Sequence, residues 1–328
     1  MRINRFTINA LFVLLLPVVV AVFGLGVFSA VALVVLGLLW RWSLTLSALT
    51  SPPSGPEVRL ETISASHYVE KARWCLDRLG VPYVEDHNAG TLGVFFLGRT
   101  VPRLHVRTGA VMSSIGNSSD ILRYLWGRYG VEYGERAAFL EPTKEALDLE
   151  RQFDEYGRDM QRWIYWHILP DKRFTLHAWG ANDPTLPAWQ RSLVKLLYPI
   201  LRTMITKAFR LSPQAKQKAV ENIDRVIASV DERLADGRKT LLGGDSLSFV
   251  DITFAALSGH WTYPEGYGRG KVEAVILTAE HLPPEMAREM AAWREKYPRV
   301  AAFIERVYRD ERDPQGSAGA PSPAGAAT

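Results

Sequence analysis

Two serines stand where a helix is expected to begin, and both are candidates for chemistry. Ser66 precedes the amphipathic stretch from Tyr68 to Leu79, and Ser118 lies in "NSSDILRYL", just before a second amphipathic stretch. A hydroxyl at a helix N-terminus can donate a hydrogen bond to an anion such as a thiolate or a carboxylate, and the helix dipole favours negative charge there. Each serine could instead be a plain N-cap. The sequence therefore indicates an anion-binding site and leaves both interpretations open.

The remaining reactive residue types exclude several classes of protein. The chain of 328 residues holds one cysteine, Cys75, so it can form neither an intramolecular disulfide nor a metal site built on cysteines. Its seven histidines show no spacing typical of metal ligands, so no metal is expected. The net charge is only +4, and basic residues are mixed with acidic ones, which argues against a nucleic-acid partner. Cys75 shares an apolar helix face with Ala72, Leu76 and Leu79, so we expect it to be buried.

The N-terminal segment is expected to lie outside the globular fold. Residues 10–40 contain no charge, and about 18 apolar residues suffice to span a bilayer as a helix. One tilted span is the first interpretation. A re-entrant hairpin is the alternative, because Pro17 and the pair Gly24 and Gly26 could kink or break the helix. A signal peptide would have a shorter apolar core, and a buried soluble helix would need apolar partners all round.

The rest of the chain has a mixed part followed by a helical part. The expected order is β-α-β and then β-β-α, over residues 58–64, 68–79, 83–86, 100–106, 110–112 and a helix that begins near residue 118. Nearly all of residues 143–310 follow helical periodicity. The Pro-rich residues 51–56 are expected to form a stiff linker, and residues 313–328 a disordered tail.

This order of elements resembles that of the cytosolic glutathione transferases. The resemblance covers residues 58–312 and rests on four local matches, namely Ser66, Val101 with Pro102, Ser118 with Ile121, and Ser248 with Asp251. It implies the fold class: an α/β thioredoxin-like domain plus an all-α C-terminal domain, preceded here by a transmembrane helix. The expected domains are residues 1–56 (membrane segment and linker), 57–132 (thioredoxin-like), 133–312 (helical) and 313–328 (tail).

The resemblance also implies a role for individual residues. Ser66 would be the catalytic residue, whose hydroxyl stabilises the thiolate of glutathione without becoming a nucleophile itself. The remaining glutathione-binding residues would be Arg99, Val101, Pro102, Asn117 and Ser118. In the family a cis proline follows Val101, whose backbone pairs with the cysteinyl part, and the Ser118 position holds the γ-glutamyl end. Arg99 could reach the glycyl carboxylate or simply be solvated.

Three positions depart from the family pattern. His67 stands where a proline is common; it could aid the thiolate as a cation or face solvent, and we expect it to face solvent. Val69 replaces a small residue or a second cysteine, and Asn117 replaces an acidic residue, so one charge contact with the ligand is lost. Ser248 and Asp251 match a capping box, which has a structural role.

An aromatic stripe on the long helix after residue 143 is a candidate for the second substrate. Tyr156, Met160, Trp163 and His167 follow helical spacing and could line a pocket for an apolar electrophile. Such a stripe could equally belong to the core. Nothing in the residue pattern names the electrophile.

The resulting hypothesis is a membrane-anchored glutathione transferase with glutathione as co-substrate and no metal. Its expected partners are glutathione, an apolar small molecule and the lipid bilayer, and its state as monomer or homodimer is left open. The globular part is expected in the cytoplasm, where reduced glutathione is abundant. Two alternatives remain: a non-catalytic binding or assembly module on the same fold, and a prostaglandin synthase-like isomerase, which would typically carry Cys-x-x-Cys where this chain has Ser66 and Val69.

Overall fold

The computed structural model describes residues 17–50, 57–63, 65–88, 101–108, 111–277 and 282–312. Arg99, the expected linker and the expected tail lie outside these residues. The chain divides into two units, one made of residues 1–57 and 106–113 and the other of residues 58–105 and 114–328.

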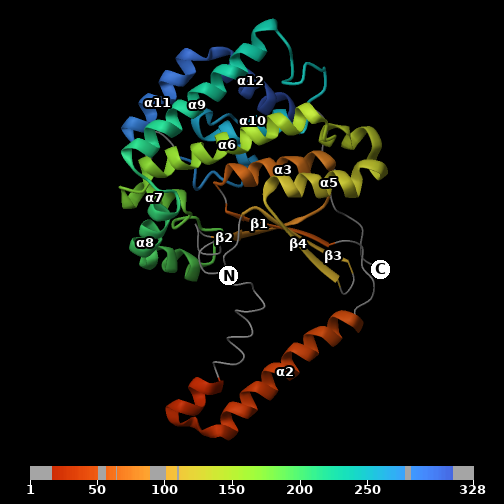
Figure 1. Ribbon diagram of the computed structural model, residues 1–328, viewed down its shortest axis with the longest axis vertical. Helices are drawn as coiled ribbons and strands as arrows, with labels where there is room; N and C mark the ends of the chain where they lie inside the picture. The colour runs from red at the N-terminus through yellow and green to blue at the C-terminus, as the bar shows by residue number, and fades with distance from the viewer. Residues whose placement is uncertain are drawn as a thin grey trace. The chain divides into compact units, whose positions relative to one another are not determined.

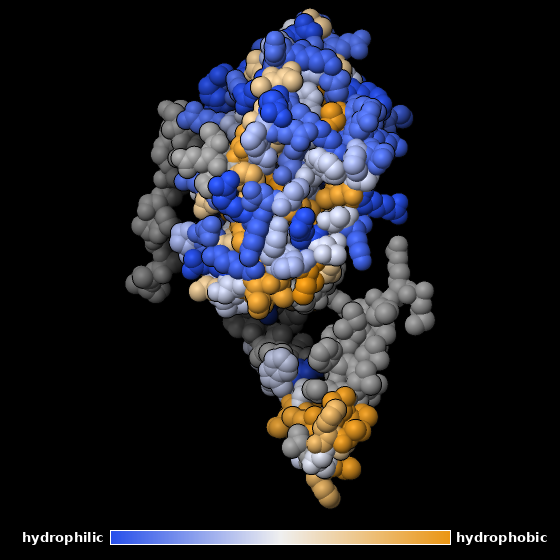
Figure 2. Space-filling model, turned by 90° about the vertical axis from the view of Figure 1, so that its left-hand side faces the viewer, coloured by the Kyte–Doolittle hydropathy of each residue, from blue (hydrophilic) through white to orange (hydrophobic). Residues whose placement is uncertain are grey.

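The first unit is dominated by one long apolar helix, α2 (Gly26–Thr50), which follows the short π-helical turn η1 (Ala21–Leu25). Gly24 and Gly26 have φ angles of 89° and 77°, which only glycine adopts readily, so the predicted break at this pair is confirmed. The window Gly26–Ser43 has a mean hydropathy of 1.6 and is long and apolar enough to cross a membrane. Figure 2 shows its hydrophobic surface. Helix α2 spans Gly26–Thr50, so it begins and ends later than the apolar segment expected at residues 10–40.

A four-stranded sheet precedes the helical part of the chain, and the tip of its C-terminal hairpin, residues 106–113, is assigned to the first unit. The strands β1 (Glu57–Ile63), β2 (Val84–Asn88), β3 (Arg103–Thr108) and β4 (Val111–Gly116) lie in the order β2-β1-β3-β4. β1 and β2 are parallel, with Arg59 opposite Val84, and helix α3 (His67–Leu79) makes the crossover between them. β3 and β4 are joined by only two residues, so they must be antiparallel. The expected order of strands in the mixed part is therefore confirmed.

Two helices cover the sheet on one face, α3 and α5 (Ser118–Tyr133), and lie between the sheet and the helical part (Figure 1). The predicted apolar face of α3 is confirmed, because Ala72, Cys75, Leu76 and Leu79 are fully buried. α3 ends at Gly80, which adopts the left-handed conformation with φ 63°.

The helical part consists of long helices packed around one central, wholly buried helix, α10. The elements are η2 (Gly134–Leu140), α6 (Lys144–Ile168), α7 (Lys172–Ala178), α8 (Ala188–Ala208), α9 (Pro213–Arg233), η3 (Leu234–Asp236), α10 (Phe249–Thr262), η4 (Tyr267–Gly270), α11 (Pro284–Lys296), α12 (Pro298–Val307) and η5 (Tyr308–Arg312). α10 packs against α3 and α6 and so connects the two parts of this unit. At its start, Asp251 accepts hydrogen bonds from the Ser248 backbone N–H (2.8 Å) and hydroxyl (2.6 Å), as expected for the capping box.

Candidate active site

A cavity of about 530 Å³ opens where the N-terminal ends of α3 and α5 meet the helical part. The sheet side contributes Ser66, Val101, Pro102, Asn117 and Ser118 to its wall. The helical side contributes α6, α7, α8, the end of α10 and the segment that follows it. The structure therefore brings together the predicted glutathione-binding residues that it describes.

Ser66 lies at the N-cap position of α3, but its side chain makes no capping hydrogen bond. Its backbone is fixed instead, because the N–H donates to the Ile63 carbonyl (3.0 Å) and the carbonyl accepts from the Glu70 N–H (3.0 Å). The hydroxyl is half-buried at the cavity wall. It is therefore held at the positive end of a helix dipole, with its hydrogen not used by the helix.

Ser118, the first residue of α5, is 1% exposed, and its Oγ is buried without a hydrogen-bond partner in the described part of the chain. A buried hydroxyl without a partner is unfavourable, and such groups in native structures often bind a ligand or a water molecule. Asn117 does the capping here, because its side chain accepts from the Ser119 N–H (3.3 Å). Ser118 is thus free to bind something in the cavity.

The Val101–Pro102 peptide bond is cis, as the family resemblance implies. Both residues lie at the cavity wall directly before β3, on the sheet side with Ser66. Asn117 adopts a positive φ of 71°, a conformation that asparagine tolerates better than most residues.

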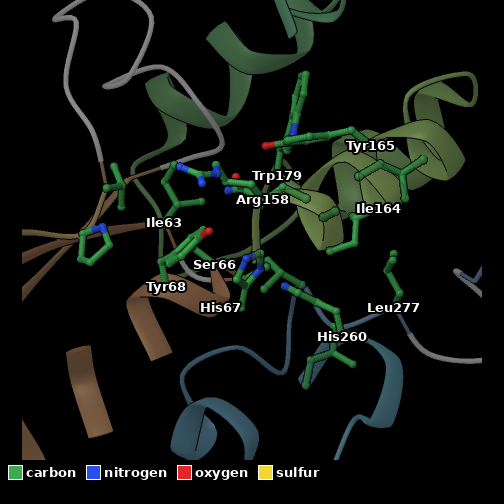
Figure 3. Close-up of a pocket in the computed structure, with 18 of the residues that line it drawn as sticks. Ile63, Ser66, His67, Tyr68, Arg158, Ile164, Tyr165, Trp179, His260 and Leu277 are labelled. Atoms are coloured by element: carbon green, nitrogen blue, oxygen red, sulfur yellow. The ribbon is translucent and has the colours of Figure 1, made fainter. Parts of the chain in front are cut away.

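His67 does not face solvent, and that expectation was wrong. Its side chain is 2% exposed, and its Nε2 lies 3.2 Å from the Gly157 carbonyl of α6, to which it must donate. Burial lowers its pKa well below the usual value, and the neighbouring His260 adds to this. His67 is therefore a neutral ring that joins α3 to α6 beside Ser66 (Figure 3).

His260 is a cavity residue that sequence reasoning missed. It lies near the end of α10, edge-on to His67 with 5.2 Å between the ring centroids. Burial lowers its pKa to about 4, in part opposed by a hydrogen bond to the backbone of Ala65. The available signal was a single histidine near the end of a helix dominated by apolar and small residues.

The aromatic stripe of α6 does not line the cavity. Tyr156, Met160, Trp163 and His167 are all buried on the core side of the helix. Tyr156 Oη lies 2.8 Å from Ser258 Oγ, and Trp163 and His167 both bond to a glutamate of α11. Their expected role in substrate binding is therefore corrected to packing.

The adjacent face of α6 forms the wall instead. It presents Arg158, Gln161, Ile164, Tyr165 and Ile168 to the cavity. Trp179, directly after α7, and residues from α8 and the segment 263–277 complete a mostly apolar lining. In Figure 3, Ile164 and Tyr165 lie across the cavity from Ser66. The wall opposite Ser66 is thus mostly apolar, with Arg158 and Gln161 as polar members.

The single cysteine of the chain does not compete for the chemistry. Cys75 is fully buried, and burial raises its pKa to about 12, so it stays an unreactive thiol. The described residues contain no cluster of three or more histidine, cysteine, aspartate or glutamate side chains that could hold a metal ion.

Residues 213–306, which run from α9 into α12, match the family described as "Glutathione S-transferase, C-terminal domain". This stretch of the helical part is therefore similar to the C-terminal domain of glutathione S-transferases. A comparison with curated proteins found no match.

Among solved structures, a glutathione S-transferase of Methylobacterium radiotolerans in complex with glutathione sulfonate is 17% identical, with a TM-score of 0.46 over 78% of this chain and 94% of that one. A glutathione S-transferase of Methylobacillus flagellatus with glutathione bound is 15% identical, with a TM-score of 0.45 over 78% of this chain and 98% of that one.

Proposed function

We propose that this chain is a glutathione transferase, anchored in a membrane by α2, that adds the thiolate of glutathione to an apolar electrophile. The observation that supports this most is the pair of helix-terminal serines in one cavity. Neither hydroxyl caps its own helix, and Ser118 Oγ is buried with no partner among the described residues.

Glutathione offers a group for each of these serines. The γ-glutamyl carboxylate suits the N-terminus of α5, where Ser118 can donate a hydrogen bond together with free backbone amides. The thiol then suits the N-terminus of α3, where Ser66 can donate to sulfur and the helix dipole favours the thiolate. The backbone of Val101 pairs with the cysteinyl part between them. Asn117 carries no charge, so it binds the ligand's amino group less strongly than an acidic residue would.

The apolar wall provides the second half of the reaction. Ile164, Tyr165 and Trp179 offer hydrophobic and aromatic surface and no catalytic group, so the electrophile is held mainly by burial. The attacking thiolate comes from the polar wall opposite. The apolar wall therefore supports an apolar electrophile but does not identify the compound.

The proposed location follows from α2 and from the co-substrate. The apolar window Gly26–Ser43 supports one membrane span. The globular part is placed on the cytoplasmic side, because reduced glutathione is abundant there.

Calorimetric titration of the full-length protein in detergent with glutathione tests this proposal. We expect saturable binding, weakened about tenfold in Ser118→Ala, because a hydrogen bond to a charged group is lost. The exposed Ser113→Ala on β4 should bind as the wild type does. No binding at millimolar glutathione would refute the proposal. Binding without conjugation of any apolar electrophile would instead support the non-catalytic alternative.

A further inference from the structure

Helix α8 carries an exposed apolar stripe. Its members are Trp189, Leu196, Ile200 and Met204, with exposed fractions of 64%, 74%, 57% and 40%. They are spaced by seven, four and four residues, which places them on one face of the helix. Figure 2 shows hydrophobic surface at the edge of the globular unit where Figure 1 places α8. An exposed apolar patch of this kind usually marks an interaction site.

The stripe is not a misplaced part of the core, because the opposite face of α8 is already packed. Val194, Leu201 and Ile205 are at most 1% exposed and form a cluster with Trp179 and Leu169. The Tyr198 hydroxyl, on the same inner face, donates to the Leu169 carbonyl (3.0 Å). The helix is therefore held in place with its second apolar face outward.

The charges around the stripe all have one sign. No acidic residue occurs between Asp183 and Glu221, so the mixing of charges in the rest of the chain breaks down here. Within α8, Lys195, Arg202 and Lys207 are exposed, and none makes an ion pair in the described part of the chain. This helix thus combines exposed apolar side chains with cations that pair with no acidic residue the structure describes.

We propose that α8 docks on the surface of an anionic lipid bilayer, with its stripe in the headgroup region and its cations on the lipid phosphates. Apolar side chains with Trp on one face and Lys or Arg beside them are typical of interfacial helices. Two copies of this surface would repel each other through their cations, whereas an anionic membrane is complementary to them. A chain with an apolar helix long enough to span a bilayer also keeps that surface within reach.

The docking has a consequence for the cavity. Ile205 and Phe209, at the C-terminal end of the same helix, belong to the cavity wall. The cavity would then lie about one helix diameter, or roughly 10 Å, from the lipid. An electrophile dissolved in the bilayer could enter without crossing bulk water.

Site-specific lipid quenching tests the docking in the full-length protein. Leu196→Cys is labelled with a fluorophore, and the protein is placed in nanodiscs whose lipids carry a nitroxide quencher. The native Cys75 is fully buried, so the wild type serves as the unlabelled blank. Ala302→Cys, exposed on α12, is the matched control. We expect several-fold stronger quenching at position 196 than at 302 in phosphatidylglycerol discs, and weaker quenching at high salt or in phosphatidylcholine discs.

Reversal of the three cations supplies the second arm. A triple variant carries Lys195→Glu, Arg202→Glu and Lys207→Glu. For each reversed cation, the ratio of molecules with α8 on the lipid surface to molecules with α8 off it should fall at least about fivefold. The affinity for glutathione should not change. Equal quenching at positions 196 and 302 would overturn the proposal. Disulfide crosslinks between two Leu196→Cys chains in place of quenching would also overturn it, by showing a second copy on this face. Neither result bears on glutathione binding, which is measured separately.

Discussion

At the scale of single residues, the charge beside the proposed thiolate decides how it is stabilised. His67 and His260 lie next to Ser66, but burial lowers the pKa of both imidazoles, so they are neutral near pH 7. Neither ring can therefore act as the cation that holds the sulfur. Among the groups at the start of α3, this leaves the hydroxyl of Ser66 and the backbone amides to stabilise the thiolate.

Ser66→Ala tests directly whether the serine hydroxyl stabilises the thiolate. Loss of one hydrogen bond to a charged group should raise the thiol pKa of bound glutathione by about one pH unit. Conjugation near neutral pH should slow about tenfold, with little change in glutathione affinity. Ultraviolet absorbance of the thiolate, followed against pH, measures the effect. Ser66→Thr, which keeps a hydroxyl, should stay close to the wild type. An unchanged thiol pKa in Ser66→Ala would remove the serine from the mechanism.

His260 makes the fold sensitive to acid. Its pKa is about 4 in the folded protein, mainly because of burial, and about 6.5 when unfolded. The unfolded chain therefore binds the proton first as pH falls below about 6.5, and stability falls with it. The loss attributable to this residue should reach about 2 kcal/mol near pH 5. Urea unfolding of His260→Asn across this range should show a shallower decline than the wild type, and parallel curves would contradict the assignment.

At the scale of elements, the start of α3 is positioned by α6 through a glycine. A Cβ at Gly157 would lie 2.6 Å from Tyr68 Oη and 3.1 Å from Leu257 Cδ2, so a larger residue does not fit. This closeness lets His67 bond to the Gly157 carbonyl (3.2 Å) and Tyr68 to the Asp154 carbonyl (3.0 Å). The two side chains after Ser66 are thus tied to the backbone of the helical part.

Gly157→Ala should separate these helices. Although alanine is the better helix former, the clash should lower the free energy of unfolding by about 1–3 kcal/mol. Activity should fall further, because Ser66 moves with α3. Tyr68→Phe removes the nearest atom, so the double variant should recover part of the stability. Gly127→Ala in α5, where a Cβ meets nothing within 4 Å, is the control and should be neutral or slightly stabilising. Thermal unfolding of the wild type, Gly157→Ala, the double variant and Gly127→Ala measures these differences in stability.

Local patterns predicted the elements well and their tertiary partners poorly. The buried face of α3 that includes Cys75 was predicted correctly, because a helix packed on a sheet buries one apolar stripe. In α6 one face packs against α9 and α10 and another lines the cavity, and periodicity cannot say which is which. The burial of His67 depends on a carbonyl 90 positions away, so no local pattern reveals it.

At the scale of the whole molecule, a buried ionic network joins the last described turn to α3 and β2. Arg312 donates to Glu70 (2.7 Å) and to Asp77 (2.8 Å), both on α3. Arg73 pairs with Glu70 (2.9 Å) and with Glu85 of β2 (2.5 Å). The Glu70, Arg73 and Arg312 side chains are all fully buried, so each charge depends on its partners.

Arg312→Ala should therefore destabilise the protein by about 3 kcal/mol, because it leaves Glu70 buried with a single cation. The effect must depend on pH. Burial by itself would raise the pKa of Glu70, but Arg312 and Arg73 outweigh it and hold the pKa below its usual value. The stabilisation is thus complete above about pH 4.5 and is lost as pH falls through the folded pKa. Urea unfolding should show a much lower free energy of unfolding for the variant than for the wild type near neutral pH, and a smaller difference in acid.

The control is Arg309→Ala, which removes an exposed ion pair with Asp310 and should change stability by less than about 0.5 kcal/mol. Equal losses in the two variants would mean that the C-terminal turn does not hold α3 in place.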